Sequence, residues 1–398
     1  MNCHPKEHCQ KTKELALQLS KEKVYKWLVT EGYFPEAYVL PPCFKVTKSP
    51  EFGKTYFKFK QKEQKGKHKK TEFKPILSEI QQVNFPKTDF TDRTFGIIDP
   101  AIHSDISYII ANNWSTVVNS IYNDENQVYS YSFPFPLDSK KPGKIGKKRS
   151  GRMIYEWIEM VENDVASIAF QYEHLIKTDI KNFYPSIYTH SIPWALHGKD
   201  NIKKNNNRNN YHLFGNCLDK LFQNANDGCT NGIPIGPIVS DIIAEIVLSG
   251  VDNEITSLLT KEGIQDRVTL VRFKDDYRIL AKSKSDGNSV LNNLQSTLKE
   301  YNLELNDRKT TFYELPDGLF RNWRSQYYNV NPENKKFHDF ESFKELYLSV
   351  IQIERENPNC GVIDRFLSDL INKKDYQINI KLDGQSLPKI LSMLLSSG

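Results

Sequence analysis

Apolar residues recur every three to four positions in several segments of the chain, which is the spacing of one helical face. The segments predicted as helices on this basis are residues 11–30, 152–171, 237–260 and 286–301, and the pattern is mostly helical beyond residue 338. The helix over 237–260 has clear ends, because Pro237 suits a first helical turn and Gly263 suits a position just beyond the last turn.

Short apolar runs between these helices predict β-strands. Residues 174–180, with the sequence HLIKTDI, form a strand candidate that ends at the carboxylate of Asp179. Residues 268–280 predict a strand, a tight turn and a second strand, with Asp275 and Asp276 at the turn. Helices that alternate with short, mostly antiparallel strands indicate an α+β fold with helical ends.

Charge is distributed unevenly along the 398 residues, although the formal net charge is only +5. Residues 54–74 hold nine lysines against two glutamates, and residues 140–152 hold seven Lys or Arg and no acid. Such blocks favour binding to a polyanion through counterion release, and they are equally typical of solvated surface loops. Lys148 and Arg152 in the second block are the candidate contacts to nucleic acid.

Six cysteines with no CxxC pair are typical of a reducing compartment. Cys3, His4, His8 and Cys9 crowd into one terminal cluster, whereas a closed zinc site uses two separated ligand pairs. We therefore expect a disordered N-terminus, with zinc binding as the less favoured alternative. The chain shows no apolar signal segment and no long apolar run, which predicts a cytoplasmic protein without a membrane partner.

The positions of three acids suggest a chemistry. Nucleotidyl transfer to a hydroxyl requires neutralisation of the triphosphate and activation of a weak nucleophile, and two Mg²⁺ ions about 4 Å apart do both. Such ions need carboxylates from separate strands, as Asp179 on one strand and Asp275 and Asp276 on a hairpin would provide. Adjacent aspartates repel each other without a cation, although an Asp pair is also ordinary turn chemistry. Tyr184 is either the floor of a sugar pocket that excludes a 2′-OH or a core aromatic.

Five segments around these acids resemble motifs of the reverse transcriptases. The segment DIKNFYPSIYTH, which begins at Asp179, resembles motif A. The segment RFKDDYRIL, which contains Asp275 and Asp276, resembles motif C. The segment NGIPIGPIVSDIIAEI resembles motif B, a glycine loop that leads into a helix, and the segment LELNDRKTTF resembles motif D. The fingers hairpin of the family resembles FPKTDFTDRTFGIIDP. The five segments follow the family's order across residues 85–315, and they imply a right-hand fold of fingers and palm with a helical, thumb-like C-terminal region.

The sequences of the segments FYPSIYTHSIPWALHGK and IPIGPIVSDIIAEI are most similar to those of the bacterial abortive-infection and other defence-associated reverse transcriptases. Two positions depart from the common pattern: Ile235 stands where most of the family has glutamine, and Lys274 stands where motif C usually has a small or apolar residue. Because members of this group make DNA with or without a conventional template, the resemblance implies RNA-directed or untemplated DNA synthesis in antiphage defence.

The resemblance also implies roles for individual residues. Asp179, Asp275, Asp276 and the backbone of Ile180 would hold two Mg²⁺ ions, for which Mn²⁺ could substitute. The residues implied to bind the incoming deoxynucleotide are Lys87, Arg93, Ile180, Phe183, Tyr184 and Gly236. Lys309 would donate a proton to the leaving pyrophosphate. The structural alternatives are surface charges for the first two cations and a plain salt bridge for Lys309.

The predicted organisation is an N-terminal extension with a basic segment (1–84), a fingers-like region (85–178), a palm (179–316) and a thumb-like region (317–398). Expected partners are dNTPs, an RNA template or noncoding RNA, the DNA product, and a second copy or a partner polymerase. A catalytically silent palm scaffold and an RNA-dependent RNA polymerase are the competing functions. Burial of three acids without metal is costly, which argues against the scaffold, and Tyr184 argues against RNA synthesis.

Overall fold

The computed structural model describes residues 4–35, 39–40, 43–58, 60–64, 67–88, 90–138, 141–146, 161–204, 206–331, 337–358, 360–371, 378–380 and 386–395. It forms two compact units, Met1–Leu319 and Phe320–Gly398. Each unit has hydrophobic core of its own. The finer division at residues 84, 178 and 316 stays a prediction.

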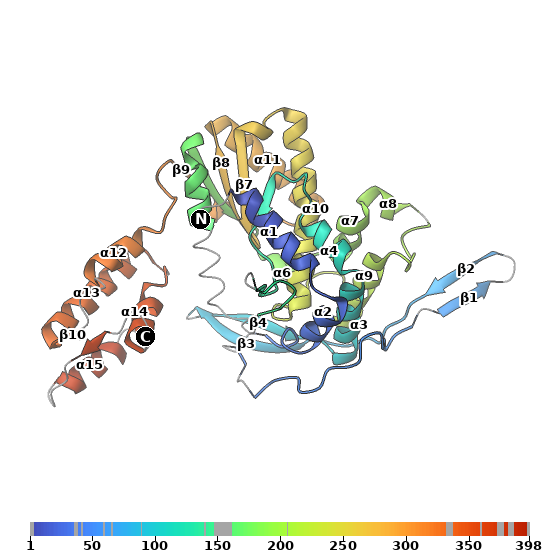
Figure 1. The fold of residues 1–398 in the computed structure, drawn as a ribbon, viewed down its shortest axis with the longest axis horizontal. Helices are drawn as coiled ribbons and strands as arrows, with labels where there is room; N and C mark the ends of the chain where they lie inside the picture. The colour runs from blue at the N-terminus through green and yellow to red at the C-terminus, as the bar shows by residue number, and fades with distance from the viewer. Residues whose placement is uncertain are drawn as a thin grey trace. The chain divides into compact units, whose positions relative to one another are not determined.

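A five-stranded sheet organises the first unit (Figure 1). Its strands, in spatial order, are β5 (Val128–Ser130), β7 (Val268–Phe273), β8 (Asp276–Ala281), β6 (His174–Asp179) and β9 (Thr311–Glu314). β8 runs antiparallel to both of its neighbours, β7 and β6. The strand predicted at 174–180 and the hairpin predicted at 268–280 are therefore confirmed, and their pairing places the end of β6 beside the hairpin turn.

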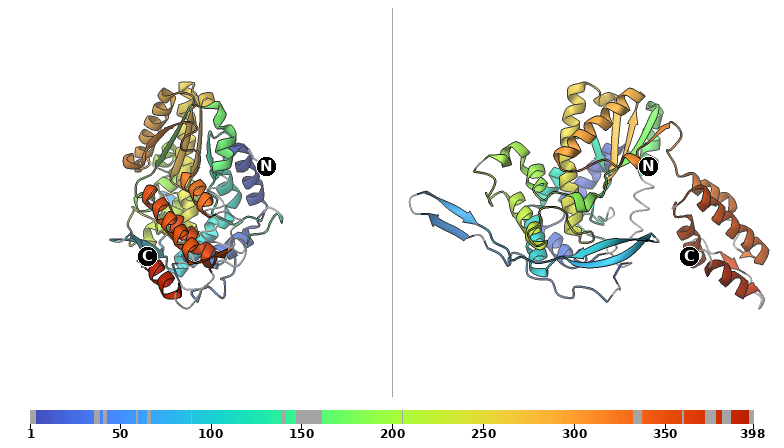
Figure 2. Two further views of the ribbon diagram at one scale, coloured as in Figure 1. Left: turned by 90° about the vertical axis from the view of Figure 1, so that its left-hand side faces the viewer. Right: turned by 180° about the vertical axis from the view of Figure 1, so that it is seen from behind.

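Side chains alternate between the two faces of this sheet, as the strand period requires. Ile176 and Ile279 belong to the main core, on the face against which helix α11 (Lys284–Glu300) packs (Figures 1 and 2). Leu175 and Leu280 belong to a smaller core on the other face, shared with apolar residues of the helical segment 161–168. Asp179 and Asp276 follow the second alternation, so both carboxylates lie on the face of the smaller core.

Helix α10 (Ile238–Glu262) is the longest described helix and confirms the helix predicted over 237–260. Pro237 precedes its first turn, and Gly263 ends it in the left-handed conformation with φ of +67°. Unlike a surface helix, α10 is buried along most of its length, which explains its largely apolar sequence. The helix predicted over 286–301 is confirmed as α11, which begins two residues earlier.

The single helix predicted over residues 11–30 is wrong, because the chain forms α1 (Pro5–Leu17) and α2 (Lys21–Val29) instead. The Ser20 hydroxyl accepts a hydrogen bond from the Lys23 N–H and caps the second helix. The expected disordered N-terminus is also corrected from residue 4 onward. The Trp114 indole donates to the Ala16 carbonyl at 2.8 Å and anchors α1 to the core.

The remaining elements of the first unit are two hairpins and several short helices. The hairpins are β1 (Lys60–Gln64) with β2 (Lys67–Glu72) and β3 (Gln81–Thr88) with β4 (Thr91–Ile97). The helices are α3 (Pro100–Asn112), α4 (Trp114–Ile121), α6 (Phe183–Ser186), α7 (Ser191–His197), α8 (Lys199–Lys203) and α9 (Phe214–Ala225). The 3-10 turns are η1 (Ala169–Gln171), η2 (Gln265–Arg267) and η3 (Asp307–Lys309).

The second unit is mostly helical, as its sequence predicts. Its elements are α12 (Asn322–Val330), α13 (Phe340–Glu356), α14 (Val362–Ile371) and α15 (Ser386–Leu395), with the short parallel strands β10 (Phe337–His338) and β11 (Asn379–Ile380). Phe343 and Phe366 stack with ring centroids 6.0 Å apart in its core. Among the helices that the structure describes, in either unit, none combines the length and apolar character needed to span a bilayer.

Candidate active site

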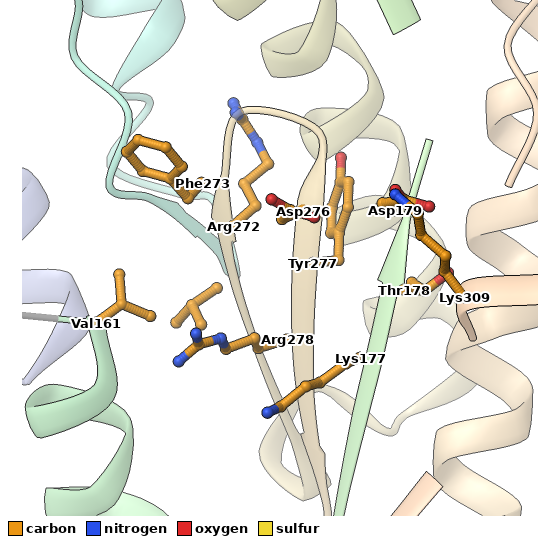
Figure 3. A pocket seen from close by; sticks show the side chains of 11 residues that line it. Val161, Lys177, Thr178, Asp179, Arg272, Phe273, Asp276, Tyr277, Arg278 and Lys309 are labelled. Carbon is orange, nitrogen blue, oxygen red and sulfur yellow. The ribbon is translucent and has the colours of Figure 1, made fainter. Parts of the chain in front are cut away.

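The turn of the β7–β8 hairpin lies beside the end of β6. Asp179 is the last residue of β6 and pairs with Asp276, the first residue of β8, while Asp275 occupies the turn. The Ile180 N–H donates to the Asp275 carbonyl at 3.2 Å and ties the two segments together. Asp179 and Asp276 line a cavity of about 310 Å³ on this face of the sheet (Figure 3). Asp179, Asp275 and Asp276, called the acid cluster below, are thus brought together from two segments.

Asp179 is the buried member of the acid cluster, with 6% of its surface exposed. Its Oδ2 accepts a hydrogen bond from Lys309 Nζ at 2.5 Å, and this bond raises the pKa of Lys309. Its Oδ1 is buried and accepts no hydrogen bond from the described residues. One oxygen of the buried carboxylate therefore has a cationic neighbour, and the other lacks a donor.

The acids also raise one another's affinity for protons. Burial raises the pKa of Asp275, and the nearby charge of Asp179 adds to the rise. Burial and the charges of Asp275 and Asp179 raise the pKa of Asp276 to about 6. Because Asp276 is exposed to solvent although the residues around it are crowded, solvent screens much of this effect. The cluster holds more negative charge than its protein neighbours neutralise.

These features fit a divalent cation. Carboxylate oxygens are the ligands that Mg²⁺ prefers, and a cation would both relieve the repulsion and meet the bare Asp179 Oδ1. In the part of the chain that the structure describes, no group of three or more His, Cys, Asp or Glu side chains, the acid cluster included, is arranged so that it could hold a metal ion. Lys309 is the positive group that contacts Asp179 in this arrangement.

The aromatic pair that follows Asp179 lies in α6. Phe183 is buried in the main core, and Tyr184 is 9% exposed. The Tyr184 hydroxyl donates to Asp241, which lies in the first turn of α10. The same carboxylate accepts a bond from Lys274 Nζ at 3.3 Å. Tyr184 is therefore both a core aromatic and a member of a polar group beside the acid cluster.

The predicted glycine of motif B has a structural reason of its own. Gly236 has a φ of +125°, and a Cβ there would lie 2.8 Å from Pro35 Cγ and 3.4 Å from Phe95. The Gly96 N–H of β4 donates to the Ile235 carbonyl at 2.8 Å, so the β3–β4 hairpin is fastened to the loop before α10. The glycine permits this close approach.

The cations predicted to bind the triphosphate are not joined to the acid cluster. Lys87 and Arg93 lie on the exposed part of the β3–β4 hairpin, and no hydrogen bond or ion pair of the described residues links either to the cluster. Lys148 and Arg152 lie outside the described residues. Their roles stay predictions.

The sequence of this chain matches a known protein family. The family model for reverse transcriptase (RNA-dependent DNA polymerase) matches residues 125–340, more than half of the chain. The chain belongs to the reverse transcriptase family. Its predicted fold class is confirmed: an α+β right hand with fingers, palm and a helical thumb-like C-terminal region.

Solved telomerase structures are among those similar to this reverse transcriptase. The apo telomerase of Candida tropicalis is 12% identical over 81% of this chain and 61% of its own, with a TM-score of 0.41. The form truncated from its C-terminal domain is 13% identical over 61% of this chain and 51% of its own, with a TM-score of 0.36. The Candida albicans telomerase in complex with a fragment of telomeric RNA is 11% identical over 81% of this chain and 57% of its own, with a TM-score of 0.34. This chain therefore spans only half to three fifths of those chains. No curated protein matches the sequence.

A second group of charges in the reverse transcriptase was not foreseen from sequence. Arg272 on β7 is 1% exposed, and its guanidinium contacts Glu245 Oε2 and Asp252 Oδ2, both at 2.8 Å. Arg272, Glu245 and Asp252 are called the buried ion cluster below. Its acids are buried within α10, a largely apolar helix, and that was the available signal, because a buried charge needs a partner.

The N-terminal Cys/His run does not converge on a common point. His4 caps α1, and His8 stacks on Tyr131 with ring centroids 4.4 Å apart. Burial lowers the pKa of His8 to about 4. The Cys9 thiol donates to the Ser130 carbonyl at 3.4 Å. Cys3 lies outside the described residues, and the other three side chains have separate structural uses.

Proposed function

We propose that this reverse transcriptase adds deoxynucleotides to a growing DNA strand, with an RNA template or without one, in bacterial antiphage defence. The observation that carries the proposal is the convergence of Asp179 with the Asp275–Asp276 turn, where the Asp179 Oδ1 is buried without a donor. Such an excess of carboxylate is costly in a protein unless a cation completes it.

The residues divide the work as follows. Two bound Mg²⁺ ions, or Mn²⁺, would neutralise the triphosphate and activate the attacking hydroxyl. Asp179, Asp275 and Asp276 are the side chains to hold them, with the backbone of Ile180 beside them. Lys309, whose ammonium contacts Asp179, would protonate the leaving pyrophosphate.

The nucleotide would lie between the acid cluster and the start of α10. Tyr184 would exclude a 2′-OH, and the Gly236 backbone would approach the base. Lys87 and Arg93 would grip the triphosphate through the fingers hairpin. Lys148 and Arg152 would contact the nucleic-acid backbone.

The proposed biological setting is supported by the sequences of two segments. The segments FYPSIYTHSIPWALHGK and IPIGPIVSDIIAEI are similar to those of bacterial defence-associated reverse transcriptases. The proposed setting is therefore the bacterial cytoplasm, with an RNA template or noncoding RNA, dNTPs and a second copy or a partner polymerase as partners.

One observation favours a second candidate, a catalytically silent palm that binds nucleic acid. The Lys309 ammonium lies 2.5 Å from Asp179 Oδ2, and this contact compensates part of the buried charge without a metal. The scaffold and the polymerase make opposite predictions for nucleotide incorporation.

The test is incorporation of labelled dNTPs or NTPs by the purified full chain, with Mg²⁺ and any nucleic acid that copurifies. Product from dNTPs that disappears in Asp275→Ala supports the polymerase. Asp266→Ala is the matched control, because Asp266 is an exposed acid in η2, the turn that directly precedes β7. No incorporation by the wild-type protein, or equal incorporation by Asp275→Ala, would refute the proposal.

A further inference from the structure

Three segments that are far apart in the sequence meet beside the acid cluster. Tyr184 comes from α6, Asp241 from the first turn of α10, and Lys274 from the hairpin turn just before Asp275. Lys274 has a φ of +53°, a conformation that non-glycine residues adopt only in special turns. The turn therefore directs this lysine at the cost of some backbone strain.

A single carboxylate oxygen joins the three residues. The Tyr184 hydroxyl donates to Asp241 Oδ1, and Lys274 Nζ lies 3.3 Å from the same atom. The Lys274 ammonium also lies 5.8 Å from the centroid of the Tyr184 ring, within the range of a cation–π contact. The tyrosine is thus held at its hydroxyl and across its face.

The backbone of these residues is fixed as well. The Ile233 N–H donates to the Tyr184 carbonyl at 3.1 Å, which links α6 to the loop before α10. The buried Arg272 lies 3.5 Å from the Lys274 carbonyl. Side chain and main chain together restrict movement of the Tyr184 ring.

An aromatic ring discriminates between sugars only if it cannot move away from a 2′-OH. The Lys274–Asp241 pair is the contact that prevents such movement, and the two side chains are partly shielded, with 35% and 16% of their surfaces exposed. Removal of the ammonium would leave the carboxylate held by the tyrosine hydroxyl alone, and removal of the carboxylate charge would weaken the bonds from both donors.

On the basis of the function proposed above, we propose that Lys274 and Asp241 are positioning residues for sugar selection. They hold Tyr184 in the orientation that rejects ribonucleotides.

The test compares kcat/KM for dNTP and NTP incorporation by the full chain with Mg²⁺. Lys274→Met keeps the length of the side chain and removes its charge, and Asp241→Asn keeps its shape. Each should lower the preference for dNTPs by about tenfold, mainly through better use of NTPs. Lys274→Arg should restore the preference.

Lys282→Met is the matched control, because Lys282 is an exposed lysine just beyond the far end of β8. It should leave the preference unchanged. Thermal unfolding of each variant reports whether it folds.

The outcomes separate this inference from the proposed function. If the wild-type protein incorporates dNTPs and both charge-removing variants keep its full preference, the inference fails and the polymerase assignment stands. An equal loss of dNTP and NTP use, with lower kcat and unchanged KM, would also overturn the inference, since it indicates a distorted hairpin. No incorporation by the wild-type protein would overturn both.

Discussion

The β7–β8 hairpin carries two groups of charge that differ in how they are neutralised. At its turn, the acid cluster gathers three carboxylates, and Lys309 is the cation that contacts Asp179. Two residues before that turn begins, on β7, Arg272 of the buried ion cluster is held by Glu245 and Asp252. The first group lines a cavity, whereas the second is sealed within the core.

The buried ion cluster joins two elements of the fold, whereas the acid cluster is the site proposed above for chemistry. In the buried ion cluster, the side chains of β7 and α10 match each other, and Ser130 adds a bond to Glu245 Oε2 at 2.9 Å. Burial raises the pKa of Asp252 in the buried ion cluster to about 6, and it also raises the pKa of Asp275 and of Asp276 in the acid cluster, so a raised pKa does not distinguish the two groups. The two groups differ in their cation and their surroundings: Arg272 contacts both acids of the buried ion cluster within the core, whereas Lys309 contacts Asp179 at the edge of a cavity.

The largest effect should come from neutralising an acid at the turn. We expect Asp275→Asn to lower the rate of dNTP incorporation by about 10⁴-fold, because the asparagine cannot balance a divalent cation. The free energy of unfolding should rise or change by less than about 0.5 kcal/mol, since the substitution removes repulsion. Incorporation assays and urea unfolding measure the two quantities. A large loss of stability would show that the acid cluster is structural.

Removal of the buried Arg272 should lower the stability of the fold, in contrast to the change at the turn. We expect Arg272→Met to lower the free energy of unfolding by about 3–5 kcal/mol, because it leaves two buried carboxylates without their cation. Arg267→Met is the control, since Arg267 is half exposed in its pair with Asp286 and should cost less than about 1 kcal/mol. Equal losses in urea unfolding would contradict the distinction between the clusters.

Lys309 tests whether the cation at the acid cluster serves chemistry or structure. If it protonates the leaving group, Lys309→Met should lower kcat by about 100-fold with little change in KM. Lys284→Met, which alters an exposed lysine at the start of α11, should have no effect on kcat. Unchanged kcat in Lys309→Met would assign this lysine to a plain salt bridge.

The smallest effect on stability should come from the partly exposed pair of His190 and Asp219. His190 Nδ1 donates a hydrogen bond to Asp219 Oδ2 at 2.6 Å, and this bond raises the pKa of His190 in the folded protein. Its stabilisation is therefore complete below the unfolded pKa of about 6.5 and is lost as pH rises through the folded pKa. His190→Gln should cost less than about 1 kcal/mol, and more at pH 5.5 than at pH 9. A pH-independent difference in thermal unfolding would contradict this.

Much of the local structure could be predicted from the sequence. The strand ending at Asp179, the hairpin around Asp275 and the helix between Pro237 and Gly263 all carry local signals, namely apolar period, turn residues and caps. Local signals failed at residues 11–30, where the apolar pattern continues across the Ser20 cap and hides a helix boundary. The order of the motifs was sufficient to predict the family.

The tertiary structure decided which charged residues became partners. The sequence by itself determined that Asp179 ends a strand and that Asp275 lies at a turn, although it also placed Asp276 in the turn, where the structure has the first residue of β8. It did not determine that Asp241 joins Tyr184 to Lys274, or that Arg272 joins β7 to α10. The physical reason is that backbone conformation depends on near neighbours in the chain, whereas the partner of a buried charge is set by the packing of distant segments and by the cost of leaving that charge without one.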